Sequence, residues 1–156
     1  MRKIYTIIAC LMITIMFSPT IAQASVVEPA TSIEQEIFYV DGEYTITVTT
    51  IIEQENISLF ATTSSKSVSK VYKIENILGS TVATYTLHGK FTYDGTTATC
   101  TSATYSTSTN SSLWSFESAT AYKSGAKAIG SFTAKTLLQT VSDTISISCS
   151  KTGVIS

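Results

Sequence analysis

Beyond one apolar run at its beginning, the sequence lacks any apolar stretch long enough to cross a membrane. That run covers residues 4–17, follows the basic pair Arg2-Lys3 and precedes Ala22-Gln23-Ala24. A basic start, a short apolar run and an A-x-A site are the parts of a secretory signal peptide. The alternative, a membrane anchor, would need a longer run. We therefore expect cleavage at Ala24-Ser25, which leaves an extracellular protein with no membrane contact.

The sequence also lacks a basic cluster. It has 10 basic and 11 acidic residues, and removal of residues 1–24 takes away Arg2 and Lys3, leaving 8 basic residues and a net charge near −3. Proteins that bind nucleic acid carry a basic patch or stripe for the phosphates. The sequence therefore argues against nucleic acid as a partner.

Cysteine is scarce, with three residues in the whole chain. Cys10 leaves with the signal peptide, so the secreted protein retains Cys100 and Cys149. Two cysteines without a nearby histidine make a poor metal site. In an oxidising compartment we expect them to form a disulfide, which would stabilise the fold by about 3–4 kcal/mol in the chain-entropy model. We expect neither a metal nor a cofactor.

Catalytic signatures are missing as well. His88 is the only histidine, and a general base needs both an orienting partner and a nucleophile, which sequence alone cannot place beside it. No serine lies in a G-x-S-x-G motif, and the S-x-x-K match from Ser67 to Lys70 lacks its companion motifs. We interpret His88 as a solvent-facing structural residue and expect no catalytic residue among the serines.

The sequence does contain segments in which residues of different character alternate with period two, as they do in β-strands. The clearest case is a hairpin around Asp94-Gly95, a dipeptide suited to the positive φ angles of a two-residue type I′ turn. That turn places Tyr93 opposite Thr96. It gives an inner face on which the following residues are paired: Tyr85, Leu87, Gly89, Phe91 and Tyr93 opposite Thr104, Ser102, Cys100, Ala98 and Thr96.

The other face of this hairpin is rich in hydroxyl groups and is predicted to face water. It pairs Thr84, Thr86, His88, Lys90 and Thr92 with Tyr105, Ala103, Thr101, Thr99 and Thr97. A flat row of threonines can hydrogen-bond a glycan, order water or pair with another chain. Threonine is also simply a good strand former, which is the simpler explanation. The candidate binding face comprises Thr84, Thr86, His88, Lys90, Thr92, Thr97, Thr99 and Thr101.

Other segments show the same period. Residues 25–66 are predicted to form an N-terminal hairpin with Asp41-Gly42 as its turn, followed by a Ser/Thr-rich linker. Residues 67–156 are predicted to form a β-sandwich domain, in which a three-residue loop ending at Gly125 pairs Tyr122 with Ala126 and Phe116 with Phe132. Helical periodicity is absent outside the signal peptide. We therefore predict an all-β, antiparallel, immunoglobulin-like β-sandwich with one disulfide.

Carboxylates provide the main alternative function, since two of them in one cleft can hydrolyse a glycosidic bond. Turns account for Asp41 and Asp94. The remaining candidates are Glu43, Glu53, Glu55, Glu75, Glu117 and Asp143. These lie in loops or on strand faces that we predict to be wet.

Several short segments resemble a group of small, uncharacterised secreted proteins from Gram-positive, clostridia-like bacteria. The resemblance covers nearly the whole chain, beginning with the signal peptide and Asp41-Gly42-Glu43-Tyr44. Its other residues are Gly89-Lys90-Phe91-Thr92-Tyr93-Asp94-Gly95, Ala98-Thr99-Cys100-Thr101, Trp114, Lys123-Ser124-Gly125 and Ser148-Cys149-Ser150. The resemblance implies secretion and a disulfide-bonded β domain, and it carries no activity.

Two main functions follow as hypotheses. The first is a secreted, non-enzymatic module that binds a surface, a glycan or a protein at the cell surface or in the medium. The alternative is a small secreted hydrolase that uses paired carboxylates. A toxin or its immunity partner is a third and weaker hypothesis.

Overall fold

The computed structural model describes residues 31–40, 44–56 and 63–156. The predicted signal peptide, its cleavage site and the Asp41-Gly42 turn lie outside the described residues. Among the residues that are described, no helix is long and apolar enough to span a bilayer.

The described residues form eight strands. They are β1 (Thr31–Val40), β2 (Tyr44–Asn56), β3 (Ser64–Asn76), β4 (Thr81–Tyr93), β5 (Ala98–Thr109), β6 (Ser115–Ser124), β7 (Lys127–Lys135) and β8 (Thr140–Ser148). They are rich in threonine, valine, isoleucine and tyrosine, which suit a pleated, half-buried surface. The all-β class is thus confirmed.

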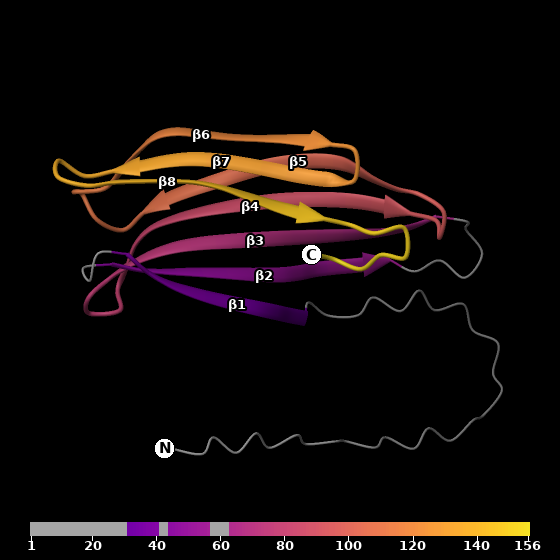
Figure 1. The fold of residues 1–156 in the computed structure, drawn as a ribbon, viewed down its shortest axis with the longest axis horizontal. Helices are drawn as coiled ribbons and strands as arrows, with labels where there is room; N and C mark the ends of the chain where they lie inside the picture. Colours follow the sequence, from indigo (N-terminus) through magenta and orange to yellow (C-terminus); the bar gives the residue numbers. More distant parts are fainter. Residues whose placement is uncertain (1–30, 41–43, 57–62) are drawn as a thin grey trace, which may run out of the picture.

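The strands form two antiparallel sheets that pack against each other (Figure 1). The first contains β1 to β5 and the second contains β6 to β8, each in sequential order. An immunoglobulin-like fold needs Greek-key crossings between its sheets. Because neighbouring strands here always follow one another along the chain, the immunoglobulin-like arrangement is not supported.

The last residues of the predicted linker are instead part of the first sheet. Residues 64–66 lie at the start of β3, which pairs with β2 on one side and β4 on the other. In this strand the half-buried Ser65 and Ser67 alternate with the buried Lys66 and Val68. A Ser/Thr-rich composition therefore does not distinguish a loop from a strand whose outer face is wet.

The β4–β5 hairpin has a longer turn than the sequence predicts. Tyr93 pairs with Ala98, so the loop has four residues and the two-residue type I′ turn is wrong. One carboxylate oxygen of Asp94 accepts hydrogen bonds from the backbone N–H groups of Thr96 and Thr97, at 2.8 and 2.6 Å. Gly95 does have the expected positive φ, 86°. The aspartate side chain thus organises the loop by binding the backbone that follows it.

A bulge then changes the register of the hairpin. Phe91 pairs with Cys100, whereas Lys90 pairs with Ser102, so Thr101 is an extra residue on β5. Its hydroxyl donates to the Lys90 carbonyl at 3.1 Å. The predicted pairing of Gly89 with Cys100 is therefore wrong. Beyond the bulge every β5 side chain lies on the opposite face from the prediction.

The β6–β7 turn also differs by one residue. Ser124 pairs with Lys127 across the two-residue turn Gly125-Ala126, in which Gly125 has a φ of 58°. The predicted pairing of Tyr122 with Ala126 is wrong, because Tyr122 lies opposite Ile129. A further shift in register, between Phe116 and Ser118, places Phe116 opposite Ala134.

Phe132 on β7 is the centre of the aromatic core between the sheets. It is not directly opposite Phe116 as predicted, although their rings are 6.0 Å apart. Its ring centroid lies 4.8 Å from those of Tyr72 and Tyr85, which come from the other sheet. The Tyr85 hydroxyl crosses to β6 and donates to the Thr120 carbonyl at 2.7 Å. Burial and the nearby Tyr105 raise the pKa of Tyr85 to about 12.

The predicted disulfide between Cys100 and Cys149 is not present in the structure. Both cysteine backbones contact the β6–β7 turn. The Cys100 N–H donates to the Gly125 carbonyl at 2.8 Å, and the Cys149 N–H donates to the Ala126 carbonyl at 3.0 Å. Both side chains are buried, and burial raises the pKa of the Cys100 thiol. A thiol kept in its protonated form reacts slowly, so burial itself protects this sulfur.

The segment after β8 folds back and contacts both sheets. Cys149 and Ile155 form a bridge, and the carbonyl of Lys151 accepts the N–H of Gly95 at 2.9 Å. The carbonyl of Gly153 accepts a hydrogen bond from the buried Lys66 ammonium at 2.8 Å. This return segment, residues 149–155, therefore joins β8 to β3 and to the β4–β5 turn.

The Asp94 turn leads to a pH prediction. Hydrogen bonds from Thr96 and Thr97 hold the pKa of Asp94 well below its ordinary value of 3.8. A carboxyl group whose pKa is lower in the folded state stabilises the fold above its unfolded pKa, and this contribution disappears as the pH falls further. We expect Asp94→Asn to lower the urea midpoint at pH 7 and to change it much less near pH 2.

Glu117→Gln is the control for this experiment. Glu117 forms an exposed ion pair with Lys135 at 2.5 Å, and such pairs contribute little to stability. Its midpoint should stay near that of the wild type at both pH values. An Asp94→Asn protein as stable as the wild type at pH 7 would refute the role of this carboxylate.

Candidate functional site

The outer face of the first sheet is the side that β6, β7 and β8 leave uncovered. The second sheet contacts β3, β4 and β5 on the side where Leu87 and Phe91 are buried. Side chains alternate along a strand, so the residues between these project from the opposite side. We define the outer face by its hydroxyl residues: Thr45, Thr47, Thr49, Ser65, Ser67, Ser69, Thr84, Thr86, Thr92, Ser102, Thr104, Ser106 and Ser108.

The β4 half of the predicted binding face lies together on this outer face. Thr84, Thr86, His88, Lys90 and Thr92 alternate with the buried residues of β4. The β5 half is more dispersed. Thr99 lies opposite Thr92, Thr101 occupies the bulge, and Thr97 belongs to the turn, where its hydroxyl donates to Asp94 at 3.0 Å.

Beyond the bulge, sequence reasoning assigned the wrong β5 residues to the outer face. Ala103 and Tyr105 were expected outside but lie opposite the inward-facing Gly89 and Leu87, and the Tyr105 ring stacks on Tyr85 at 5.8 Å. Thr104 and Ser106 take their places on the outer face. Nothing in the local sequence marks the bulge at Thr101, so the alternation by itself could not have identified them.

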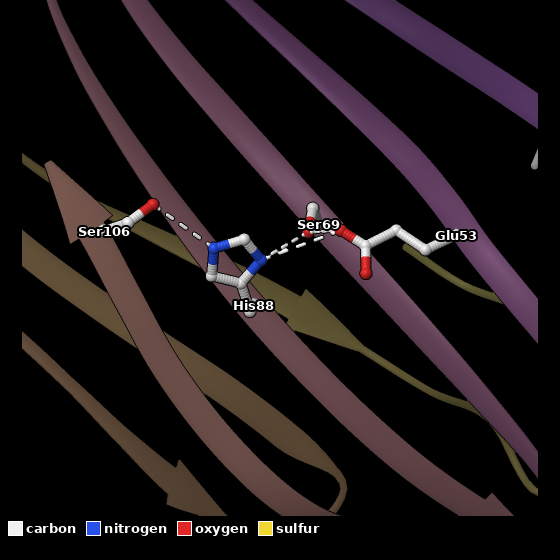
Figure 2. Close-up of polar contacts among 4 residues, drawn as sticks. All are labelled: Glu53, Ser69, His88 and Ser106. Atoms are coloured by element: carbon white, nitrogen blue, oxygen red, sulfur yellow. Dashed lines mark hydrogen bonds and ion pairs between the residues drawn. The ribbon is translucent and has the colours of Figure 1, made fainter. Parts of the chain in front are cut away.

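A row of four polar side chains crosses the middle of this face, one from each of four neighbouring strands (Figure 2). Ser69 on β3 donates a hydrogen bond to the carboxylate of Glu53 on β2. The Ser69 oxygen is 2.6 Å from Nδ1 of His88 on β4, and the Glu53 oxygen is 3.7 Å from the same nitrogen. On the other side of the ring, Nε2 is 3.3 Å from the hydroxyl oxygen of Ser106 on β5. We call these four residues the polar row.

Two irregularities bring the polar row together. Glu53 lies where the β2–β3 register shifts between Ile52 and Gln54, and the β5 bulge brings Ser106 onto the outer face. Sequence reasoning named His88 for the binding face and Glu53 only as a candidate carboxylate. Ser69 and Ser106 were not named, and the contacts that join the four residues became visible only in the structure.

The other described carboxylates have separate local partners. Glu75 accepts from Thr47 at 3.1 Å, and Glu117 contacts Lys135. Asp143 lies near Tyr72, whose pKa is raised by burial and by this carboxylate. Within the described ranges, no three histidine, cysteine or acidic side chains gather where they could hold a metal ion. The interactions of these acids provide no positive support for a paired-carboxylate site.

Comparison with known proteins adds no relative, since no protein-family model, curated protein or solved structure matches the chain.

Proposed function

We propose that the protein is a secreted, non-enzymatic module that binds a neutral glycan through the outer face of its first sheet. The observation that supports this most is the hydroxyl array itself, which extends over β2, β3, β4 and β5 on the side that β6, β7 and β8 leave uncovered. Sugars present hydroxyl groups that both donate and accept, and threonine and serine hydroxyls do the same.

The apolar residues favour a glycan over a protein partner. Protein interfaces are built around aromatic or other large anchors that become fully buried. The exposed large apolar residues in the described part of the chain lie in turns, in the return segment, on β6 or on the inner side of β5. They are Ile77, Leu78, Tyr105, Leu113, Tyr122, Leu137, Leu138 and Val154.

The charges favour a neutral glycan over an anionic one. Lys73 and Lys90 contribute two cations to the outer face, and Glu53 and Glu75 contribute two anions. An anionic polymer would require an excess of positive charge, because its repeated charges need partners. Balanced charges with many hydroxyls suit a ligand that is polar but uncharged.

A polysaccharide array tests this proposal. We expect the wild type to bind at least one neutral polysaccharide. The triple variant Thr86→Ala, Lys90→Ala, Thr104→Ala should bind it at least about tenfold more weakly, since each lost hydrogen bond is worth about 0.5–1.5 kcal/mol. The variant removes exposed or half-exposed groups and should melt close to the wild type.

The second sheet offers a matched control. On its outside, Ser131 bonds Thr144 and Thr133 bonds Ser142, each at 3.0 Å. Ser131→Ala with Ser142→Ala removes hydroxyls from a similar strand surface and should leave binding unchanged. Binding to anionic polysaccharides alone, no binding to the array, or equal losses in both variants would overturn the proposal.

A further inference from the structure

The hydrogen-bond directions in the polar row determine which nitrogen of His88 carries the proton. A carboxylate only accepts hydrogen bonds, so the single hydroxyl hydrogen of Ser69 is used in its contact with Glu53. The Ser69 oxygen, 2.6 Å from Nδ1, must then accept a hydrogen from that nitrogen. A neutral imidazole carries one N–H. In the neutral ring, Nε2 then has the free electron pair and accepts from the Ser106 hydroxyl.

This order of groups is the one that activates a serine in acyl-transfer enzymes. There, the nucleophile contacts one ring nitrogen while a carboxylate orients the ring through the other. In the polar row, Ser106 occupies the nucleophile's position, and Glu53 acts on Nδ1 through Ser69. The two serines differ in access, because Ser69 is only 3% exposed whereas Ser106 is open to solvent.

We propose that His88 acts as a general base that makes Ser106 a nucleophile toward activated esters, with Ser69 and Glu53 as positioning residues. The inference does not depend on glycan binding, and it concerns a single acylation of Ser106 without turnover, which a non-enzymatic module can undergo. The acyl donor meets the polar row from solvent, on the open side of β5.

In the proposed step, the acyl group moves from the ester to Ser106. The Ser106 oxygen forms a bond to the carbonyl carbon of the ester as its proton moves to Nε2 of His88. The carbon–oxygen bond to the leaving group then breaks, and the Nε2 proton is passed to the departing alkoxide or phenoxide. The products are an ester on Ser106 and a free alcohol or phenol, and no redox partner is needed.

Acetylation by p-nitrophenyl acetate, followed by peptide mass mapping, tests the nucleophile. General-base assistance typically contributes about 10²–10⁴-fold, so Ser106 should be acetylated at least tenfold faster than Ser142. Ser142 is a suitable reference because it is an exposed strand serine whose hydroxyl contacts Thr133 rather than an imidazole. His88→Gln should reduce the rate at Ser106 to that of Ser142, and Ser142→Ala should not affect it.

Nitrogen NMR tests the positioning residues independently. His88 is the only histidine in the chain, so its ring signals need no assignment strategy. The wild type should show Nδ1–H as the major neutral tautomer. Glu53→Gln should lower that population and slow acetylation, because a glutamine amide can donate to Ser69 and release it to donate to Nδ1. Glu53 is about half exposed, so this variant should keep its fold.

Two results would overturn the inference. One is a wild-type ring that carries its proton on Nε2. The other is acetylation of Ser106 at the rate of Ser142, or at a rate that His88→Gln does not change.

Discussion

Replacing Phe132 with alanine should lower the free energy of unfolding by about 3–5 kcal/mol, the usual range for removing a buried aromatic side chain. The ring is 3% exposed and contacts Tyr72 and Tyr85 from the opposite sheet and Phe116 from its own. Its loss would leave a cavity at the centre of the interface between the sheets. Chemical denaturation measures the effect as a lower midpoint with an unchanged slope.

Phe116→Ala serves as the comparison. Phe116 belongs to the same cluster but is only partly buried, so its truncation should cost clearly less than that of Phe132. Phe132→Leu, which keeps most of the apolar volume, should also be milder. Equal losses from the two alanine variants would show that Phe132 is not the centre of this core.

Gly130→Ala should destabilise the protein by about 2–4 kcal/mol, although alanine adds only one methyl group. An ideal β-carbon at Gly130 would lie 2.2 Å from the Tyr85 hydroxyl and 3.1 Å from a methyl of Leu87. Tyr85 cannot easily move away, since its hydroxyl bonds the Thr120 carbonyl and its ring stacks on Phe132. Overpacking costs about 1–3 kcal/mol, and loss of the hydrogen bond adds about 1 kcal/mol.

A double-mutant cycle with Tyr85→Phe isolates the cause. Tyr85→Phe removes the oxygen that the new methyl would meet, so Gly130→Ala should cost less in that background than in the wild type. The comparison uses unfolding free energies of the four proteins under one condition. Strictly additive losses would mean that the Tyr85 hydroxyl is not what excludes a side chain at position 130.

The positions of strands and turns could be predicted because they depend on local chemistry. Alternating β-branched and aromatic residues identified eight strands, and Gly95 and Gly125 occupy turns with positive φ as expected. The length of each turn was harder to predict. At Asp94 it depends on side-chain hydrogen bonds to Thr96 and Thr97, which the Asp-Gly signal does not reveal.

Register could not be predicted, because a bulge depends on side-chain contacts beyond the local sequence. The extra residue at Thr101 moves Tyr105 inward to stack on Tyr85, a contact with a residue twenty positions earlier. The same shift brings Ser106 to His88. Ser106, one of the four residues of the polar row, was therefore hidden by a feature that has no local sequence signal.

The expected disulfide illustrates a different limit. Cysteine number and compartment indicate that two thiols could pair, but only the fold determines their separation. Here the backbones of Cys100 and Cys149 both bind the Gly125-Ala126 turn. The strand order could not be predicted from the sequence either, because antiparallel strands of this kind fit a Greek key as well as the sequential sheets observed.

The return segment has a consequence for the order in which the chain can fold during synthesis. Sequential sheets have mostly local contacts, so β1 to β5 can pair one hairpin at a time as they emerge. The hydrogen bond from Lys66 to the Gly153 carbonyl spans 87 residues. Until residue 153 has been synthesised, Lys66 lacks this acceptor. Closure of the two sheets at that end is thus a late event in folding.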